Sequence, residues 1–318
     1  MVLSRSGRLM YPPEGLGALQ EVIWADRSGR MEPVEPGWTV QPLPNGGVEL
    51  SPDEQSIAIG IAAPGGAEVW VKQLSGPFTR LAFEGTSSRP AWSVDGRSVM
   101  FVSDVGGNRD LIMRRADGSG QREVVLDVEA PLLDGRWSPD GTWVVIRTPA
   151  PRDVLGFRPG VDSIPVALLE SEFDETAPIV SPDGRFLAYV SDESGRWEVY
   201  VRPFPNVNDA RTLVSTDGGR EPRWAHSGQE LFYKNAGGQL VAVAVTTDDG
   251  FQVTARTPLF TLPPGSSFYP HRATYDVTRD DQRFLMIRAK GATDDRPIGQ
   301  YVVVENFLGE LRQRMGSN

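Results

Sequence analysis

The stretch SPDGRFLAYVSDESGRWEVYVRPF, from Ser181 to Phe204, holds a tight corner followed by two runs of strand-forming residues. Proline presets φ for the second position of a type I turn, aspartate can accept a hydrogen bond from a nearby backbone N–H, and glycine supplies the positive φ that ends the turn. The runs that follow are rich in Val, Tyr and Phe and are bounded by Gly, Pro and Asp, as expected for β-strands. The stretch therefore predicts a corner between two strands, then a turn and a third strand.

This corner recurs seven times, with its serine or equivalent residue at positions 4, 51, 93, 138, 181, 225 and 278. The steps between copies are 47, 42, 45, 43, 44 and 53 residues. A period of about 40–45 residues with several short strands per unit is typical of a β-propeller blade. We therefore expect an all-β fold, a β-propeller of seven blades. Six and eight blades are the alternatives because the units at both ends are incomplete.

Most units also predict a weaker fourth strand, such as residues 79–83 or 210–215, which gives about four antiparallel strands per blade. Residues 306–314, NFLGELRQR, show a helical period and predict a short C-terminal helix. Residues 1–318 then form a single domain. Because the first unit begins at Met1 with almost no room for its inner strand, we expect the chain to be truncated at its N-terminus.

The corner is structural rather than catalytic. Its proline is replaced by Val94, its aspartate by Ser227, and its glycine by Glu54 or Asp281, yet the strand pattern continues through every copy. A reactive group would not recur in near-copies once per blade.

Composition excludes several classes of protein. Hydrophobic residues make up 39% and charged residues 23%, as in ordinary globular proteins. The net charge is −10 and no cluster of Lys and Arg could form a basic face, so we expect no nucleic-acid partner. The chain has no cysteine, which excludes disulfides and thiolate metal sites. No signal peptide is recognisable, and no apolar run approaches the roughly 18 residues of a membrane span.

The form W-S-P-D-G, as at Trp137, resembles the TolB-like, WD-like propeller repeat over essentially the whole chain. Longer stretches are similar to the C-terminal propeller of a family of bacterial receptor-type serine/threonine protein kinases. These stretches are residues 21–34, 171–205, 215–224, 230–235 and 283–289. In that family a cytoplasmic kinase domain precedes a membrane span and then the propeller, which implies an extracytoplasmic location. This chain lacks the kinase Gly-rich loop, His-Arg-Asp and Asp-Phe-Gly motifs, so the resemblance implies no kinase activity here.

No catalytic motif is found. The nucleophile elbow G-x-S-x-G is absent. Two distant histidines without cysteine do not make a typical zinc site, and the Asp-rich turns lack EF-hand spacing, so we expect no metal and no cofactor. His226 replaces the proline of a corner, which favours a solvated turn residue. His271 lies in the longest loop between blades, beside Phe268 and Tyr269, and is a candidate ligand contact.

The alternative hypothesis is an enzyme that uses a pair of carboxylates. The acids predicted near the inner strands are Glu221, Asp134, Glu129 and Asp276. Two of them at roughly 5–10 Å across the channel would fit a glycosidase-like channel hydrolase. The linear sequence does not decide whether any two are so placed.

The main hypothesis is a non-enzymatic binding propeller, a sensor or scaffold module that we expect to be monomeric. Arg89, Arg136 and Arg223 precede corners on the inner strands and are interpreted as a basic ring at the channel mouth. With Glu221 and His271 they form the predicted ligand site, suited to an anionic ligand or a peptide carboxylate. The alternative is that these arginines pair with local acids such as Asp134 and Glu221.

Overall fold

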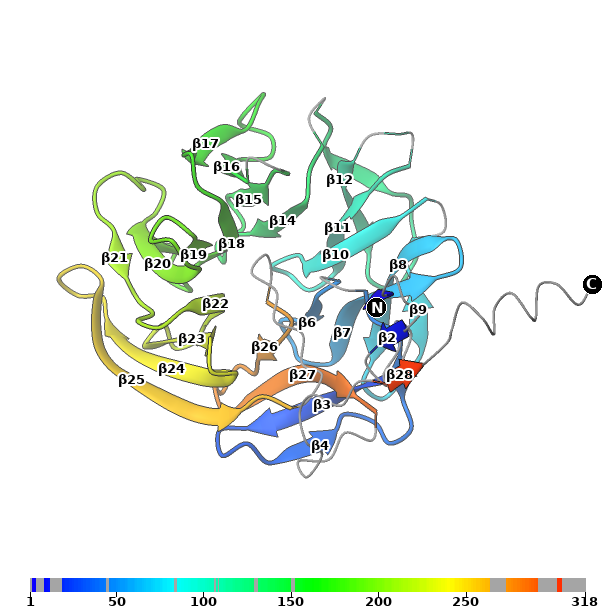
Figure 1. The fold of residues 1–318 in the computed structure, drawn as a ribbon. Helices are drawn as coiled ribbons and strands as arrows, with labels where there is room; N and C mark the ends of the chain where they lie inside the picture. Colours follow the sequence, from blue (N-terminus) through cyan, green and yellow to red (C-terminus); the bar gives the residue numbers. More distant parts are fainter. Residues whose placement is uncertain are drawn as a thin grey trace, which may run out of the picture.

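The computed structural model describes residues 19–290 except 44–45, 83–84, 106, 108, 129–130, 150–151 and 264–272, and the backbone of three strands at 2–3, 9–11 and 302–304. In these ranges the chain forms a ring of six blades, each with a row of four antiparallel strands (Figure 1). No α-helix occurs in the described ranges, and thus none that could cross a membrane. The helix expected at residues 306–314 lies outside them.

The first three blades follow one another along the chain. Blade 1 contains β6 (Val48–Leu50), β7 (Ser56–Ala63), β8 (Gly66–Gln73) and β9 (Phe78–Arg80). Blade 2 contains β10 (Ser87–Trp92), β11 (Ser98–Ser103), β12 (Asp110–Arg115) and β13 (Glu123–Leu126). Blade 3 contains β14 (Asp134–Trp137), β15 (Val144–Arg147), β16 (Val154–Phe157) and β17 (Val166–Leu169). In each blade the first strand is the innermost one.

The next two blades repeat the pattern, and the last combines both ends of the chain. Blade 4 contains β18 (Glu175–Val180), β19 (Phe186–Ser191), β20 (Glu198–Pro203) and β21 (Thr212–Leu213). Blade 5 contains β22 (Gly219–Trp224), β23 (Glu230–Asn235), β24 (Gln239–Thr246) and β25 (Gln252–Thr261). Blade 6 contains β26 (Asp276–Val277), β27 (Arg283–Ala289), β3 (Gln20–Asp26) and β4 (Met31–Pro33), and β5 (Thr39–Val40) also pairs with β3.

The expected count of seven blades is wrong, because the first and last sequence units merge. β27 pairs with β3 over seven residues, from Arg283 opposite Asp26 to Ala289 opposite Gln20, so blade 6 takes its inner strands from one end of the chain and its outer strands from the other. The corner copy at Ser4 lies instead between β1 (Val2–Leu3) and β2 (Leu9–Tyr11), which form a separate small sheet with β28 (Val302–Val304). The expected N-terminal truncation rested on counting the unit that begins at Met1 as a blade, and this closure does not test it.

The corners have the predicted turn chemistry. In five blades a Ser or Thr hydroxyl donates to Oδ1 of the aspartate two residues later at 2.5–2.7 Å. That oxygen accepts the backbone N–H two residues further on, at 3.0–3.1 Å. The position of the glycine has positive φ even where another residue stands there, with 58° at Glu54 and 59° at Asp281. The aspartates are therefore structural acceptors.

The corner of blade 5 lacks the aspartate and is held by its neighbour. Its backbone N–H groups at His226 and Ser227 donate to the two carboxylate oxygens of Asp281 in blade 6, at 2.6 and 3.1 Å. His226 Nε2 also lies 3.2 Å from the carbonyl oxygen of Val277. Asp281 stands where four of the other five blade corners have glycine, so this exception to the repeat joins two blades.

The corner aspartates predict a loss of stability in acid. Hydrogen bonds, the hydroxyl of Ser93 above all, lower the pKa of Asp95. A group with a lowered folded-state pKa stabilises the fold above its unfolded pKa of about 3.9 and loses that effect as the pH falls through the folded value. We expect Asp95→Asn to lower the dependence of the free energy of unfolding on pH between pH 5 and 3, as measured by urea denaturation at several pH values. Asp209→Asn, at an exposed loop position, is the control, and an equal slope in both variants would contradict the prediction.

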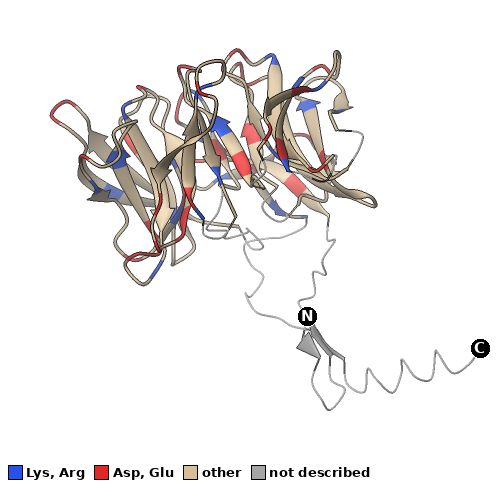
Figure 2. Ribbon diagram, turned by 90° about the horizontal axis from the view of Figure 1, so that it is seen from above, with Lys and Arg blue, Asp and Glu red and all other residues tan. Residues whose placement is uncertain are grey.

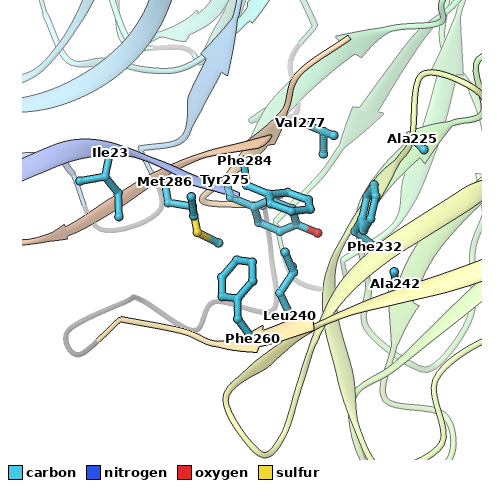
Figure 3. Close-up of a cluster of buried hydrophobic side chains, with 12 residues drawn as sticks. Ile23, Ala225, Phe232, Leu240, Ala242, Phe260, Tyr275, Val277, Phe284 and Met286 are labelled. Carbon is cyan, nitrogen blue, oxygen red and sulfur yellow. The ribbon is translucent and has the colours of Figure 1, made fainter. Parts of the chain in front are cut away.

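The cores lie between successive blades, where the faces of neighbouring sheets pack together. Figure 3 shows the cluster between blades 5 and 6, in which the Phe232 and Phe284 rings meet edge to face with centroids 5.0 Å apart. Two of the recurrent tryptophans also join blades through their indole N–H groups. Trp92 donates to the carbonyl oxygen of Glu49 at 3.1 Å, and Trp224 donates to that of Ile179 at 3.2 Å.

Candidate functional site: the channel mouth

One position of the repeat lies at the mouth of the central channel. It is two residues before the first residue of each corner, near the end of each inner strand. In chain order its occupants are Glu49, Ala91, Arg136, Ile179, Arg223 and Asp276. All of these except Ala91 line a cavity of about 460 Å³ at the corner end of the ring. All six blades contribute to the cavity, which is also lined by Trp92, Trp137 and Trp224.

Two ion pairs cross the ring of channel positions. Arg136 Nη2 lies 2.9 Å from Oε2 of Glu49, although blade 2, which has the small Ala91 at this position, stands between their blades. Arg223 Nε lies 3.7 Å from Oδ1 of Asp276 and donates to the carbonyl oxygen of Tyr275 at 3.1 Å. Figure 2 shows acidic and basic positions close together on strands in the middle of the molecule. The channel mouth therefore has mixed charge rather than a basic ring.

Burial perturbs the second pair. The pKa of Asp276 is raised, chiefly by burial and against the attraction of Arg223. The pKa of Arg223 is lowered, again chiefly by burial and then by the charge of Arg136. Both carboxylate oxygens of Asp276 are engaged, since Oδ2 accepts the N–H of Leu50 at 2.8 Å and Oδ1 accepts that of Val277 at 3.0 Å.

Two buried donors of residues that line the cavity have no acceptor within the part of the chain that the structure describes. They are Nη2 of Arg223, whose side chain is 4% exposed, and the indole N–H of Trp137. Trp92 and Trp224 stand at the same position in their blades and do have acceptors. A buried N–H without a partner costs roughly 1–3 kcal/mol. Neither donor therefore has the compensating hydrogen bond that its burial calls for.

The structure separates the three arginines of the predicted ring. Arg136 and Arg223 occupy equivalent positions and face the same cavity. Arg89 lies two residues further from its corner than they do, is not among the residues that line this cavity, and donates from Nη1 to the carbonyl oxygen of Leu133 at 2.8 Å. Its backbone has a φ of 60° at a bulge in β10.

The other two predicted ligand residues lie elsewhere. Glu221 is fully buried between blades 5 and 6, where its Oε2 lies 2.9 Å from Lys234 Nζ and accepts the N–H of Thr274 at 2.6 Å. His271 falls outside the described residues. Sequence reasoning missed Glu49, which lines the cavity. His226 is an exposed turn residue, as expected, and it also lines the cavity. The signal that could have identified Glu49 is its position two residues before the corner serine, Ser51.

The acids considered for hydrolysis also lie in different parts of the molecule. Asp134 makes a two-point pair with Arg147, with distances of 3.1 and 2.6 Å, and Glu129 lies outside the described residues. Glu49 and Asp276 share the cavity, but Glu49 is paired with Arg136. In the described ranges no group of three or more His, Asp or Glu residues could hold a metal ion.

Comparison with known proteins supports the fold. No protein-family model matches the chain, and no curated protein matches its sequence. A protein from Agrobacterium tumefaciens assigned as TolB is similar in structure, with a TM-score of 0.64 and 17% identity over 85% of this chain and 98% of that one. TolB from Acinetobacter baumannii gives a TM-score of 0.55 and 16% identity over 77% of this chain and 65% of that one. A chain of a nidogen/laminin complex gives a TM-score of 0.53 and 12% identity over 84% of this chain and 97% of that one. The chain is thus a β-propeller similar to TolB-like propellers at low identity.

Proposed function

We propose that this protein is a non-enzymatic binding propeller, a sensor or scaffold module, and that the cavity at the channel mouth takes an anionic group. The group is the carboxylate of a peptide or of a small molecule. The observation that carries the proposal is the pair of arginines from blades 3 and 5, Arg136 and Arg223, that line one cavity. Beside them, two buried donors of lining residues, Arg223 Nη2 and Trp137 Nε1, have no acceptor among the described residues. A carboxylate supplies two acceptor oxygens and a charge that favours arginine.

The wider context supports a binding role. Ligand sites are concave and combine apolar walls with convergent polar groups, and this cavity combines three tryptophans with Arg136 and Arg223. Propellers of similar structure occur in the nidogen/laminin complex and in the mitotic checkpoint complex. The resemblance to receptor-kinase propellers suggests a sensor exposed outside the cytoplasm.

A channel hydrolase is the weaker alternative. It needs one carboxylate free to donate a proton and another free to attack or to activate water. Glu49 is held by Arg136, and Asp276 by two backbone N–H groups. We therefore favour binding.

The test is a panel of tripeptides that differ in net charge and in having a free or amidated C-terminus, with affinity measured by calorimetry. We expect acidic peptides with a free carboxylate to bind best. The Arg136→Ala/Arg223→Ala variant should weaken that binding at least tenfold, because each arginine contributes charge and hydrogen bonds to the bound group.

The matched control is Arg97→Ala/Arg122→Ala, which removes two exposed arginines and should bind as the wild type does. Because Arg223 is buried, Trp137→Phe is a second variant that removes one donor and keeps most of the packing. A folded double variant with full affinity, or no preference for the free carboxylate, would remove the proposal.

A further inference from the structure

A second cavity, of about 390 Å³, lies between blades 1 and 2 and shares no described lining residue with the channel-mouth cavity. Its walls include Leu81 and Ala82, which follow β9, and Phe101 and Ile112 from β11 and β12, all of them buried. Arg114 lies on the same face of β12 as Ile112, and its Nη1 donates to the carbonyl oxygen of Leu81 at 2.8 Å. A cavity of this size is within the range of small-molecule sites.

The cavity also has polar walls. Ser87 and Ser103, which are 0% and 4% exposed, line it with hydroxyl groups whose oxygens lie 3.1 Å apart. The described lining residues include no Asp or Glu, although the chain has a net charge of −10. The guanidinium of Arg114 therefore has no carboxylate beside it among the described residues that line the cavity.

Blade 4 shows what fills the equivalent space elsewhere in the repeat. Blades 2 and 4 align with a constant offset of 88 residues, from Ser93 to Ser181, and the pairing registers of their strands agree. Three lining positions have smaller side chains in blade 2, and the arginine is the same in both blades. The corresponding pairs are Ser87 and Glu175, Phe101 and Tyr189, Ile112 and Tyr200, and Arg114 and Arg202.

Two tyrosine rings occupy this space in blade 4. The rings of Tyr189 and Tyr200 stack with centroids 5.7 Å apart, and Arg202 Nε donates to the hydroxyl oxygen of Tyr189 at 2.9 Å. Blade 2 keeps the first ring as Phe101, without the hydroxyl, and has Ile112 in place of the second ring. The space that is open in blade 2 therefore corresponds to one aromatic ring and an oxygen beside a guanidinium.

We propose that this cavity binds a small aromatic carboxylate, whose ring stacks on Phe101 and whose carboxylate pairs with Arg114. Aromatic rings attract one another in offset stacks, and a carboxylate is the acceptor that a guanidinium binds most strongly. The hydroxyls of Ser87 and Ser103 suit a polar substituent on the ring. The site does not depend on the proposed function of the channel-mouth cavity.

The experiment is calorimetric titration of the whole chain with 4-hydroxybenzoate at pH 7.5, with 4-hydroxybenzamide as the uncharged analogue of the same shape. We expect the amide to bind at least tenfold more weakly than the acid, because it has no charge to pair with Arg114. Ile112→Tyr should weaken binding of the acid at least tenfold, because the new ring would occupy the cavity as Tyr200 does in blade 4.

Arg114→Gln is the second variant and decides the matter if Ile112→Tyr does not fold. It keeps most of the side chain and removes the charge, so we expect it also to weaken binding at least tenfold. Arg115→Gln is the matched control. Arg115 is the next residue of β12, does not line the cavity, and pairs with Asp117 at the surface, so its loss should leave the affinity unchanged.

Two outcomes would overturn the inference. One is a wild-type protein that binds neither compound, or binds the acid and the amide equally well. The other is binding of the acid that survives Ile112→Tyr and Arg114→Gln. Its loss in Arg136→Ala/Arg223→Ala would then place the acid in the channel-mouth cavity. Binding that is weakened by the first two variants and kept in the channel-mouth variant supports a separate site between blades 1 and 2.

Discussion

The Trp224→Ala variant is expected to lose about 3–5 kcal/mol of its free energy of unfolding, the usual cost of removing a large buried aromatic side chain. Trp224 is 5% exposed and belongs to the core between blades 4 and 5. Its ring meets Phe251 edge to face with centroids 5.9 Å apart, and its N–H donates to Ile179 in the neighbouring blade. The substitution therefore removes apolar contacts and a hydrogen bond between blades at once.

Trp137→Ala is the matched control for this variant. Trp137 stands at the same position of its blade but is only partly buried, and within the described residues its N–H has no acceptor. We expect its loss to be smaller by at least about 1 kcal/mol, since no hydrogen bond is broken. Urea denaturation followed by circular dichroism measures both. Equal losses, or a loss below about 1 kcal/mol for Trp224→Ala, would contradict the role of these residues in joining blades.

Local chemistry explains why the corners could be predicted and the blade count could not. A corner depends on a few adjacent residues, so Glu54 and Asp281 could be recognised as occupants of the position with positive φ. Blade number depends on which distant strands pair. β3 was interpreted as the third strand of a first unit, and it is the third strand of the blade that begins with β26. Counting the corner motifs in the sequence therefore adds one blade for the motif at Ser4, although that motif does not belong to a blade.

The sequence predicted that arginines lie at the channel mouth, but not which residues line the cavity. Counting back from each corner identifies Arg136 and Arg223, and the same count gives Ala91 rather than Arg89 in blade 2. Two residues along a strand correspond to about 6.5 Å, enough to move Arg89 out of the cavity to the carbonyl oxygen of Leu133. The partners of the arginines could not be read from the sequence either. Acids were expected to pair with them, but Glu49 and Asp276 take that role rather than Asp134 and Glu221.

The pair that holds Glu221 gives the second large effect. Lys234 Nζ lies 2.9 Å from Glu221 Oε2, and the two side chains are 2% and 0% exposed. Lys234 also donates to Thr274 Oγ1 at 2.6 Å, so the pair joins blade 5 to the segment that enters blade 6. Removing one partner of a buried ion pair leaves an uncompensated charge, which typically costs about 3–5 kcal/mol. We expect a loss of that size for Lys234→Met, measured by urea denaturation at pH 7.

The double variant Lys234→Met/Glu221→Gln separates charge from packing. It removes both charges, while the glutamine oxygen can still accept the N–H of Thr274, so we expect it to be more stable than Lys234→Met alone. Recovery of this kind would show that the cost of the single change is the lone carboxylate in the interior. The contrary outcome is a double variant whose loss in free energy of unfolding equals the sum of the losses of the two single variants. Each side chain would then contribute through its own packing. The ion pair itself would add little to the contact between blades 5 and 6.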